Sequence, residues 1–358
     1  MDLALSPEVY FLRKSIALAA TVNPRTAIYF DTKFWIKLRD VRLGKPQDPP
    51  DAELEKVLTS AVATGRVICP FATDIFSELM RAGDLAGKRV LAKLVDELSL
   101  GLTLRTEQER VFTELEYFLQ GRSRKKPTVP MRDKMWTCPA YVVGFTLPEH
   151  PEWEPDIQRE IQKRFMDHLY TRGFSEMVDS FGDKPPVKRN DGLAAKLNRL
   201  NRENAAGMTS LAKVTREEFI AAVQFHFPTI ADILRAVTEA ETGRPADDVV
   251  PEEMKRHVLV FATVILKEYD DGTLGPQLPT LIIRSGLCAA VRWDQTRQYK
   301  KNDFPDHSHA AAALPYFDVF ATENSLAHLV QQLKFPERYQ TKVVKNSQEL
   351  VAVLNSLA

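Results

Sequence analysis

The chain has 358 residues, of which 44% are hydrophobic and 27% charged, the proportions of an ordinary globular protein. Its 48 basic and 48 acidic residues cancel, so the overall composition does not indicate a polyanion partner, although local charged patches are compatible with it. No apolar run approaches the ~18–20 residues of a membrane helix, and no basic segment leads into a long apolar core near residue 1, so neither a membrane partner nor a signal peptide is expected.

The cysteine pattern points to a reducing compartment. Cys69, Cys138 and Cys288 lie far apart and form no CxxC pair. This spacing suits neither a zinc ribbon nor a disulfide framework, so we expect reduced thiols and a cytoplasmic location.

The first hundred residues alternate between predicted helices and strands. Ser6 before Pro7 marks the start of the first helix, because Ser is a preferred N-cap and Pro fits the first helical turn. In chain order we expect a helix at 6–20, a strand at 27–30, a helix at 51–64 ending at Gly65, a strand at 66–70, helices within 73–83 and 88–101, and a strand at 102–105.

The middle of the chain breaks this alternation. Residues 106–280 are mostly helical and polar, with no convincing parallel strand, and the rhythm resumes with strands near 317–321 and 341–345. Asn346 and Glu349 form a capping box for a final helix. We therefore predict an α/β fold with a parallel five-stranded sheet and flanking helices, built from residues 1–105 and 281–358 and interrupted by a large helical insertion at 106–280.

Five acidic residues are expected near the carboxyl ends of the strands of this sheet. The first strand, in IYFDTKFW, runs directly into a carboxylate, and sites in open α/β sheets form at the carboxyl ends of strands. The acids expected at this edge are Asp31, Glu78, Asp306, Asp318 and Glu323. Each also has a local interpretation as a helix cap, a first-turn residue or a solvated side chain, so their joint placement carries the prediction. His307 and His309 follow Asp306 in its helix; a metal ligand or a proton shuttle is one interpretation, and the expected one is first-turn residues near the site, one of which faces solvent.

The matching segments resemble the PIN-domain nucleases. They are YFDTKFWI, ICPFATDIFSEL, DHSHAAAALPYFDVFATEN and KVVKNSQELVAVL, which lie within residues 25–105 and 284–358. Two features depart from the family pattern: Glu323 stands where Asp is more usual, and the insertion is far larger than in toxin ribonucleases of this type.

The resemblance implies a metal-dependent endonuclease that hydrolyses phosphodiester bonds, with single-stranded RNA as the expected substrate. One or two Mg²⁺ or Mn²⁺ ions would be bound by Asp31, Asp306 and Glu323, while Glu78 and Asp318 would hold metal-bound waters or orient these ligands.

Basic residues near these acids are candidates for contacting phosphates. One group precedes Asp306, a second forms one side of a helix in the insertion opposite three leucines, and the loop RSRKK at 122–126 is a third patch. The first two groups are Arg292, Arg297, Lys300 and Lys301, and Lys196, Arg199 and Arg202.

Other functions stay open at this point. A non-catalytic PIN-like binding or scaffold protein would keep the fold and use the insertion to engage a partner, and a flap-type DNA nuclease would prefer branched duplexes. Both of these functions are compatible with a homo-oligomer or with a regulatory protein partner. Lys33 stands where a haloacid dehalogenase needs a second Asp, and GxGxxG, GxxxxGK[ST] and GxSxG motifs do not occur.

Overall fold

The computed structural model describes residues 5–81, 84–122, 126–182, 192–243, 250–294 and 296–357. The chain consists of two compact units. The first comprises Met1–Thr106, Val129–Arg189 and Ala312–Ala358, and the second Glu107–Thr128 and Asn190–Ala311. These bounds differ from the expected domains, because residues 129–189 group with the sheet and residues 281–311 group with the helical unit.

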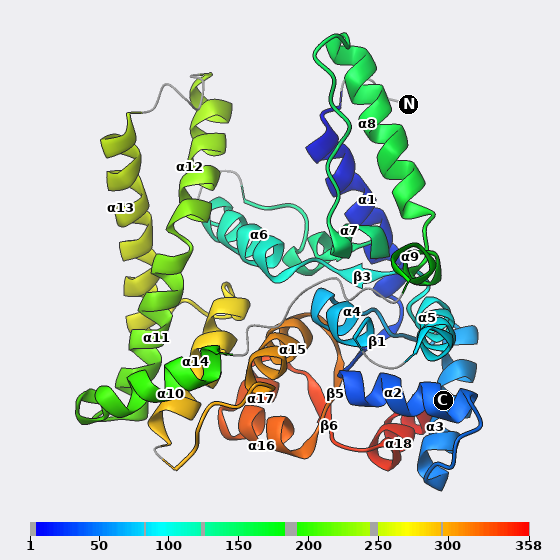
Figure 1. Ribbon diagram of the computed structural model, residues 1–358. Coiled ribbons are helices and arrows are strands. Elements are labelled where there is room, and N and C mark those ends of the chain that lie inside the picture. The colour runs from blue at the N-terminus through cyan, green and yellow to red at the C-terminus, as the bar shows by residue number, and fades with distance from the viewer. Residues whose placement is uncertain are drawn as a thin grey trace. The chain divides into compact units, whose positions relative to one another are not determined.

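The first unit contains all the strands that the structure describes (Figure 1). Its N-terminal elements are α1 (Pro7–Val22), β1 (Thr26–Phe30), α2 (Thr32–Arg42), α3 (Pro49–Ala63), β2 (Val67–Ile68), α4 (Thr73–Leu79), α5 (Leu85–Ser99) and β3 (Thr103–Leu104). The next are η1 (Met131–Lys134), β4 (Trp136–Thr137), α7 (Pro139–Val143), α8 (Pro155–Tyr170) and α9 (Phe174–Phe181). The last are β5 (Val319–Ala321), α16 (Asn324–Gln332), α17 (Phe335–Tyr339), β6 (Lys342–Val344) and α18 (Ser347–Ser356).

The main sheet has four parallel strands in the order β2-β1-β5-β6. The central strand β1 is in register with β5, with Ile28 opposite Val319 and Phe30 opposite Ala321. A parallel sheet within a mostly helical chain confirms the expected α/β class.

A sheet of five strands is not confirmed. The expected third strand pairs antiparallel with β4 instead, with Thr103 opposite Thr137 and Leu104 opposite Trp136. It contacts the segment after β2 through a parallel bridge between Phe71 and Thr103, where Leu104 N donates to Phe71 O at 2.8 Å. β4 falls within the expected helical insertion, where no strand was predicted.

Local capping signals correctly mark several helix ends. The Ser6 hydroxyl accepts a hydrogen bond from Val9 N, and Asn346 Oδ1 accepts one from Glu349 N. Gly65 follows α3 with a φ of +74°, a left-handed conformation that glycine adopts without strain.

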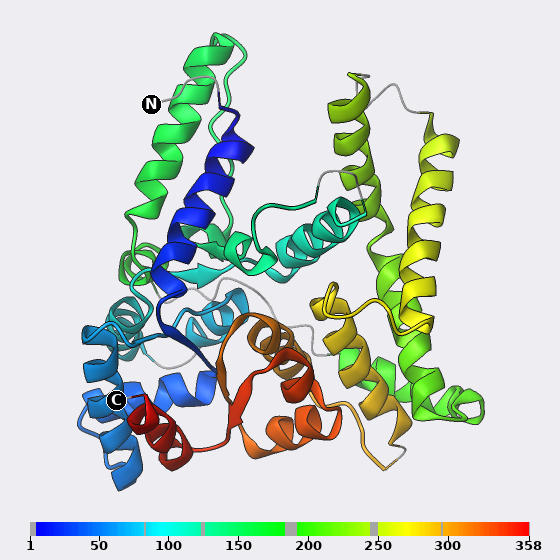
Figure 2. The same cartoon turned by 180° about the vertical axis from the view of Figure 1, so that it is seen from behind.

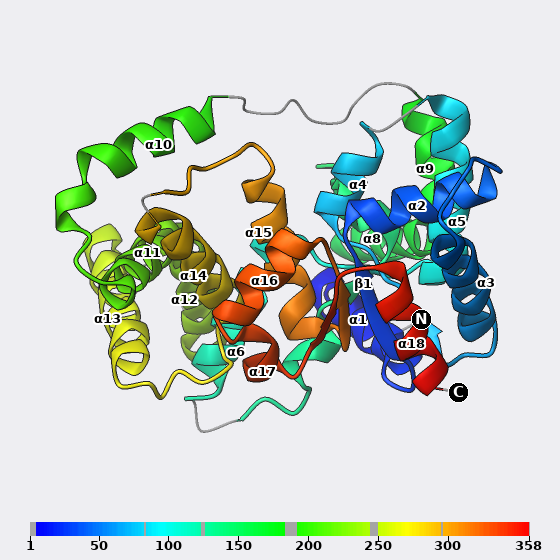
Figure 3. The same cartoon turned by 90° about the horizontal axis from the view of Figure 1, so that it is seen from below.

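The core is densest around β1. Its residues Ala27 to Phe30 are at most 1% exposed, as expected for a strand covered on both faces. Aromatic edges pack around it: the rings of Tyr29 and Phe317 lie 5.1 Å apart, and those of Trp136 and Phe317 5.4 Å apart. On the outer side α18 packs against α3, and α3 against α2 (Figure 3). This packing fixes the strand from which the first acid, Asp31, extends.

The second unit is helical throughout the residues that the structure describes. Its elements are α6 (Glu107–Gln120), α10 (Leu193–Glu203), η2 (Ala205–Gly207), α11 (Leu211–Phe225), α12 (Phe227–Thr242), α13 (Pro251–Asp270) and α14 (Pro279–Trp293). The α12 and α13 helices lie side by side (Figure 2), and α11 packs against α14. A further helix, α15 (Asp303–Tyr316), begins in this unit and ends in the first. Across the described ranges, no helix is both long and apolar enough to span a membrane.

Candidate active site at the carboxyl edge of the sheet

Asp31 is the first residue beyond β1, at the carboxyl edge of the parallel sheet. Its backbone N–H still donates to Ala321 O at 3.0 Å, so the ladder between β1 and β5 holds it in place. The side chain is 5% exposed, and Oδ1 accepts hydrogen bonds from Lys33 N at 3.0 Å and Phe34 N at 3.4 Å. Asp31 is therefore the N-cap of α2, which explains why a buried strand can end on a carboxylate. The same two bonds fix the orientation of the carboxylate.

Glu78 approaches the same place from α4. It lies in the second turn of that helix and accepts a hydrogen bond from the Thr32 hydroxyl. Since Thr32 directly follows Asp31, the two acids are linked through one short segment. Sequence reasoning did not identify Thr32 as a site residue; the signal was its position directly after the carboxylate.

Glu323 also lies at this edge. It is two residues past Ala321 in β5, where it is the N-cap residue of α16. Its Oε1 accepts a hydrogen bond of 2.6 Å from the Ser325 hydroxyl. Three of the five predicted acids, Asp31, Glu78 and Glu323, thus lie on the carboxyl side of the sheet.

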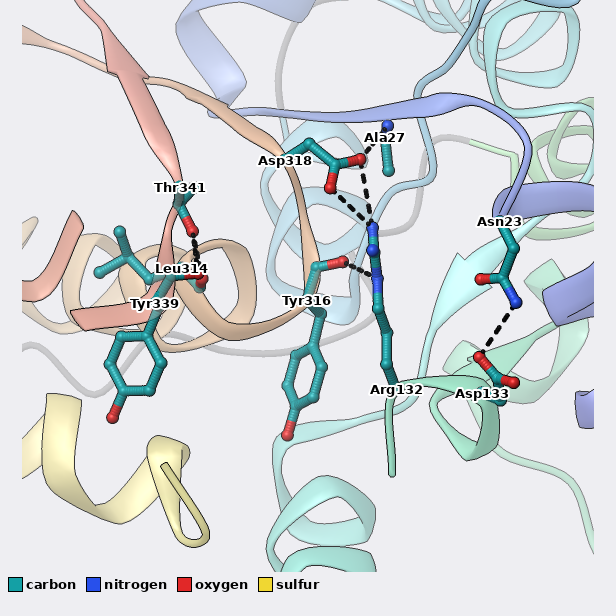
Figure 4. Close-up of polar contacts among 9 residues, drawn as sticks. All are labelled: Asn23, Ala27, Arg132, Asp133, Leu314, Tyr316, Asp318, Tyr339 and Thr341. Carbon is teal, nitrogen blue, oxygen red and sulfur yellow. Dashed lines mark hydrogen bonds and ion pairs between the residues drawn. The ribbon is translucent and has the colours of Figure 1, made fainter. Parts of the chain in front are cut away.

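Asp318 lies at the opposite edge from the one expected for it. It precedes β5, and its Oδ2 accepts a hydrogen bond from Ala27 N at 2.7 Å, near the start of β1. Figure 4 shows its carboxylate facing the Arg132 guanidinium, whose Nη2 lies 3.2 Å from each carboxylate oxygen. Ala27 and Asp31 are four residues apart along β1, which corresponds to ~13 Å at the usual rise per residue. Asp318 therefore does not join Asp31.

Asp306 belongs to the second unit and lies in the first turn of α15. The helix begins three residues earlier than expected, at Asp303. That residue accepts a hydrogen bond from Lys300 N at 2.8 Å and pairs with Arg297 at 3.3 Å. The neighbouring His307 and His309 are 1% and 2% exposed, so neither faces solvent.

Burial determines the chemistry of His307. Its Nδ1 lies 3.7 Å from Cys288 Sγ, and its Nε2 has no hydrogen-bond partner among the described residues. Desolvation, reinforced by the positive charges of Arg284 and Arg297, lowers the pKa of His307 to about 3. Burial also raises the pKa of the Cys288 thiol to about 11. These shifts favour the neutral imidazole and the neutral thiol near pH 7.

The predicted phosphate-binding residues all lie in the second unit, where ion pairs engage several of them. Arg292 pairs with Glu218, Arg297 with Asp303, and Arg199 with Glu203 at 3.7 Å. Lys196, Arg202, Lys300 and Lys301 are exposed. In the RSRKK patch, residues 123–125 lie outside the described residues.

Two hydrogen bonds join the two basic groups. Asn198, on α10, donates from Nδ2 to Tyr299 O at 3.0 Å, and Tyr299 N donates to Asn198 Oδ1 at 2.7 Å. This reciprocal pair holds the segment with Lys300 and Lys301 against the helix that carries Lys196, Arg199 and Arg202.

The acids fit a divalent cation in part. Mg²⁺ binds through oxygen ligands, needs only one or two carboxylates and retains several waters. Asp31 and Glu323 supply two carboxylates, and they follow the carboxyl ends of the paired strands β1 and β5. Within the described ranges, however, no three His, Cys, Asp or Glu side chains are grouped so as to hold a metal ion. Comparison with known proteins found no matching family model, curated protein or solved structure.

Proposed function

We propose that this protein is a metal-dependent endonuclease of the PIN-like type that hydrolyses phosphodiester bonds in single-stranded RNA. The observation that supports it best is the arrangement around Asp31, a buried carboxylate at the carboxyl end of a parallel strand, linked through Thr32 to Glu78. A catalytic carboxylate needs a fixed orientation, and two backbone N–H groups supply it here.

In this proposal Asp31 and Glu323 bind Mg²⁺ or Mn²⁺. Glu78 positions the segment that carries Asp31, through the Thr32 hydroxyl. The ion, when bound, lowers the pKa of a coordinated water and neutralises charge on the phosphate. Asp306 enters through the sequence resemblance alone, and Asp318 is left out because its carboxylate bonds at the opposite edge.

Exposed basic side chains of the second unit support a polyanionic substrate. Phosphate contacts dominate the affinity of proteins for nucleic acids and do not require a basic protein overall. Lys196, Arg202 and Lys300 offer such contacts, since each is exposed to solvent.

The test is a cleavage assay with labelled single-stranded RNA, single-stranded DNA and branched duplex DNA in the presence of Mn²⁺. The parent protein should cleave the RNA, and Asp31→Asn should lose at least about 10²-fold in rate, since it removes charge at the reacting centre. Asp48→Asn is the matched control. Asp48 is the N-cap of α3 in the same unit, is exposed and makes no side-chain capping bond, so this variant should cleave like the parent.

Each alternative function gives its own result in this assay. Cleavage by neither the parent nor Asp31→Asn, with RNA still bound, favours a non-catalytic binding or scaffold protein. Preferential cleavage of the branched duplex favours a structure-specific DNA nuclease. Asp306→Asn and Glu323→Gln, assayed beside these, report whether the acids taken from the resemblance contribute.

A further inference from the structure

A polar hollow lies at the amino edge of the sheet, within the first unit. It has a volume of about 460 Å³, in the range of small-molecule sites. Its walls come from the segment between α1 and the first residue of β1, from the residue before β2, from η1, from the residue before β5 and from the residue after α18. The lining is polar except at Pro24 and Leu357, and its polar members are Asn23, Arg25, Thr26, Arg66, Arg132 and Asp318.

The hollow has an excess of positive charge. Three arginines, Arg25, Arg66 and Arg132, and one acid, Asp318, are among its lining residues, which gives a formal excess of two positive charges. Asp318 is already satisfied by Arg132 and by Ala27 N–H (Figure 4). Among the described lining residues, no second acid balances the remaining two positive charges.

Several guanidinium N–H donors are left over. Arg132 uses Nε for Tyr316 O at 3.0 Å and Nη2 for Asp318, which leaves Nη1 without a partner in the part of the chain that the structure describes. Within the described ranges, the Arg66 side chain donates through Nε alone, to the Thr64 hydroxyl at 3.0 Å. Arg25, between α1 and β1, donates from Nη1 to Thr21 O in the last turn of α1, while its buried Nε has no partner among the described residues. An oxyanion in the hollow would accept hydrogen bonds from the unused donors of Arg66 and Arg132.

We propose that this hollow binds the phosphoryl group of a phosphate monoester. A phosphate monoester has a charge of about −1.5 to −2 near pH 7 and three strong acceptor oxygens. It thus matches both the excess charge and the number of arginines, and guanidinium forks suit phosphate geometry. A monocarboxylate would leave about one positive charge unbalanced.

This site is separate from the proposed nuclease centre. Asp318 lines the hollow, whereas Asp31 lies ~13 Å away along β1 at the other edge of the sheet. Binding in the hollow needs no metal and does not depend on the proposed function.

The experiment is isothermal titration calorimetry of the full chain, in EDTA and low salt, with adenosine 5′-monophosphate, inorganic phosphate, adenosine and acetate as probes. Adenosine 5′-monophosphate and phosphate should bind and compete with each other, while adenosine and acetate should bind at least about tenfold more weakly. Asp31→Asn should bind like the parent, so failure of the nuclease proposal is distinguishable from failure of this one.

Substitutions of Arg66 and Arg25 test whether the lining arginines bind the phosphoryl group. The Arg66 side chain is half-buried and has one neutral partner, so Arg66→Gln should leave the fold intact and weaken binding of adenosine 5′-monophosphate by roughly tenfold. Arg164→Gln removes the same charge from an exposed site on α8 and should bind like the parent. Arg25→Lys keeps the charge but loses the fork, and should retain partial affinity.

Three results would overturn the assignment: equal affinity for adenosine and its monophosphate, unchanged affinity in a folded Arg66→Gln variant, or equal losses in Arg66→Gln and Arg164→Gln. Thermal unfolding of each variant shows that a loss of binding is not a loss of fold.

Discussion

Arg132 Nη2 lies 3.2 Å from both carboxylate oxygens of Asp318, a residue 186 positions away in the chain. The same guanidinium donates from Nε to Tyr316 O, so one side chain ties η1 to the segment that leads into β5 (Figure 4). A carboxylate predicted for catalysis is thus part of a cross-link at the start of the sheet.

Substitution of Asp318 should affect stability and not cleavage. Asp318→Ala removes the acceptor of the buried Ala27 N–H, and we expect the free energy of unfolding to fall by about 1–2 kcal/mol. The coupling between Asp318 and Arg132 in a double-mutant cycle should stay below about 1 kcal/mol, because the two side chains are 42% and 35% exposed and solvent screens the pair. Urea denaturation measures both. A well-folded Asp318→Asn variant that cleaves no RNA would show that Asp318 takes part in catalysis.

Two substitutions at Asp31 should separate its capping role from its charge. Asp31→Ala removes the acceptor for Lys33 N and Phe34 N, and should cost about 1 kcal/mol of stability. Asp31→Asn keeps a capping oxygen and should unfold within about 0.5 kcal/mol of the parent, because Asn and Asp are comparable N-caps. Both should lose nuclease activity. Circular dichroism during urea unfolding gives the stabilities, and an Asn variant as unstable as the Ala variant would show that the negative charge itself holds this edge together.

His307 should make the protein acid-sensitive. In the folded state burial holds the pKa of His307 at about 3, whereas the unfolded value is 6.5. Between these values the unfolded chain binds a proton that the folded chain does not, so stability is complete above about pH 6.5 and falls as the pH drops towards 3. The slope from this one group is at most about 1.4 kcal/mol per pH unit.

His307→Gln should therefore flatten the loss of melting temperature between pH 6.5 and pH 5. The matched control is His328→Gln, since His328 is an exposed histidine on α16 and its loss should leave the pH profile unchanged. Identical profiles for the parent and His307→Gln would mean that another group is responsible for the acid sensitivity.

The basic side of α10 should contribute to the salt dependence of RNA binding. Replacing Lys196, Arg199 and Arg202 together by Gln removes up to three phosphate contacts. The slope of log affinity against log salt should become less steep by about 2 for single-stranded RNA, at ~0.7 per contact. Fluorescence anisotropy at several salt concentrations measures the slope.

A matched triple variant replaces Lys255, Arg256 and Lys267, three exposed basic residues on α13. It loses the same charge, and we expect it to keep the slope of the parent. Equal changes in the two triple variants would indicate a diffuse charge effect without a defined surface. Asn198→Ala should weaken binding with no change of charge, because it releases the Lys300 segment from α10.

The sequence by itself determined the features that depend on neighbours a few positions away. Ser6 and Pro7 start α1, Asn346 and Glu349 start α18, and the apolar run before Asp31 forms β1. Short-range hydrogen bonds and backbone preferences decide where these helices and this strand begin or end. Such ends can be predicted from a few neighbouring residues. The α/β class and the positions of Asp31, Glu78 and Glu323 after their strands follow from the same local signals.

Only the tertiary structure decided which distant segments meet. It paired β3 with β4, placed Asp318 beside Arg132, buried His307 against Cys288 and gathered three arginines at the amino edge of the sheet. A carboxylate before a strand and one after it look alike in sequence, yet the strand itself separates them by its length. Which partner neutralises a charge depends on long-range packing, because many side chains of suitable charge compete for each position and only the folded chain selects among them.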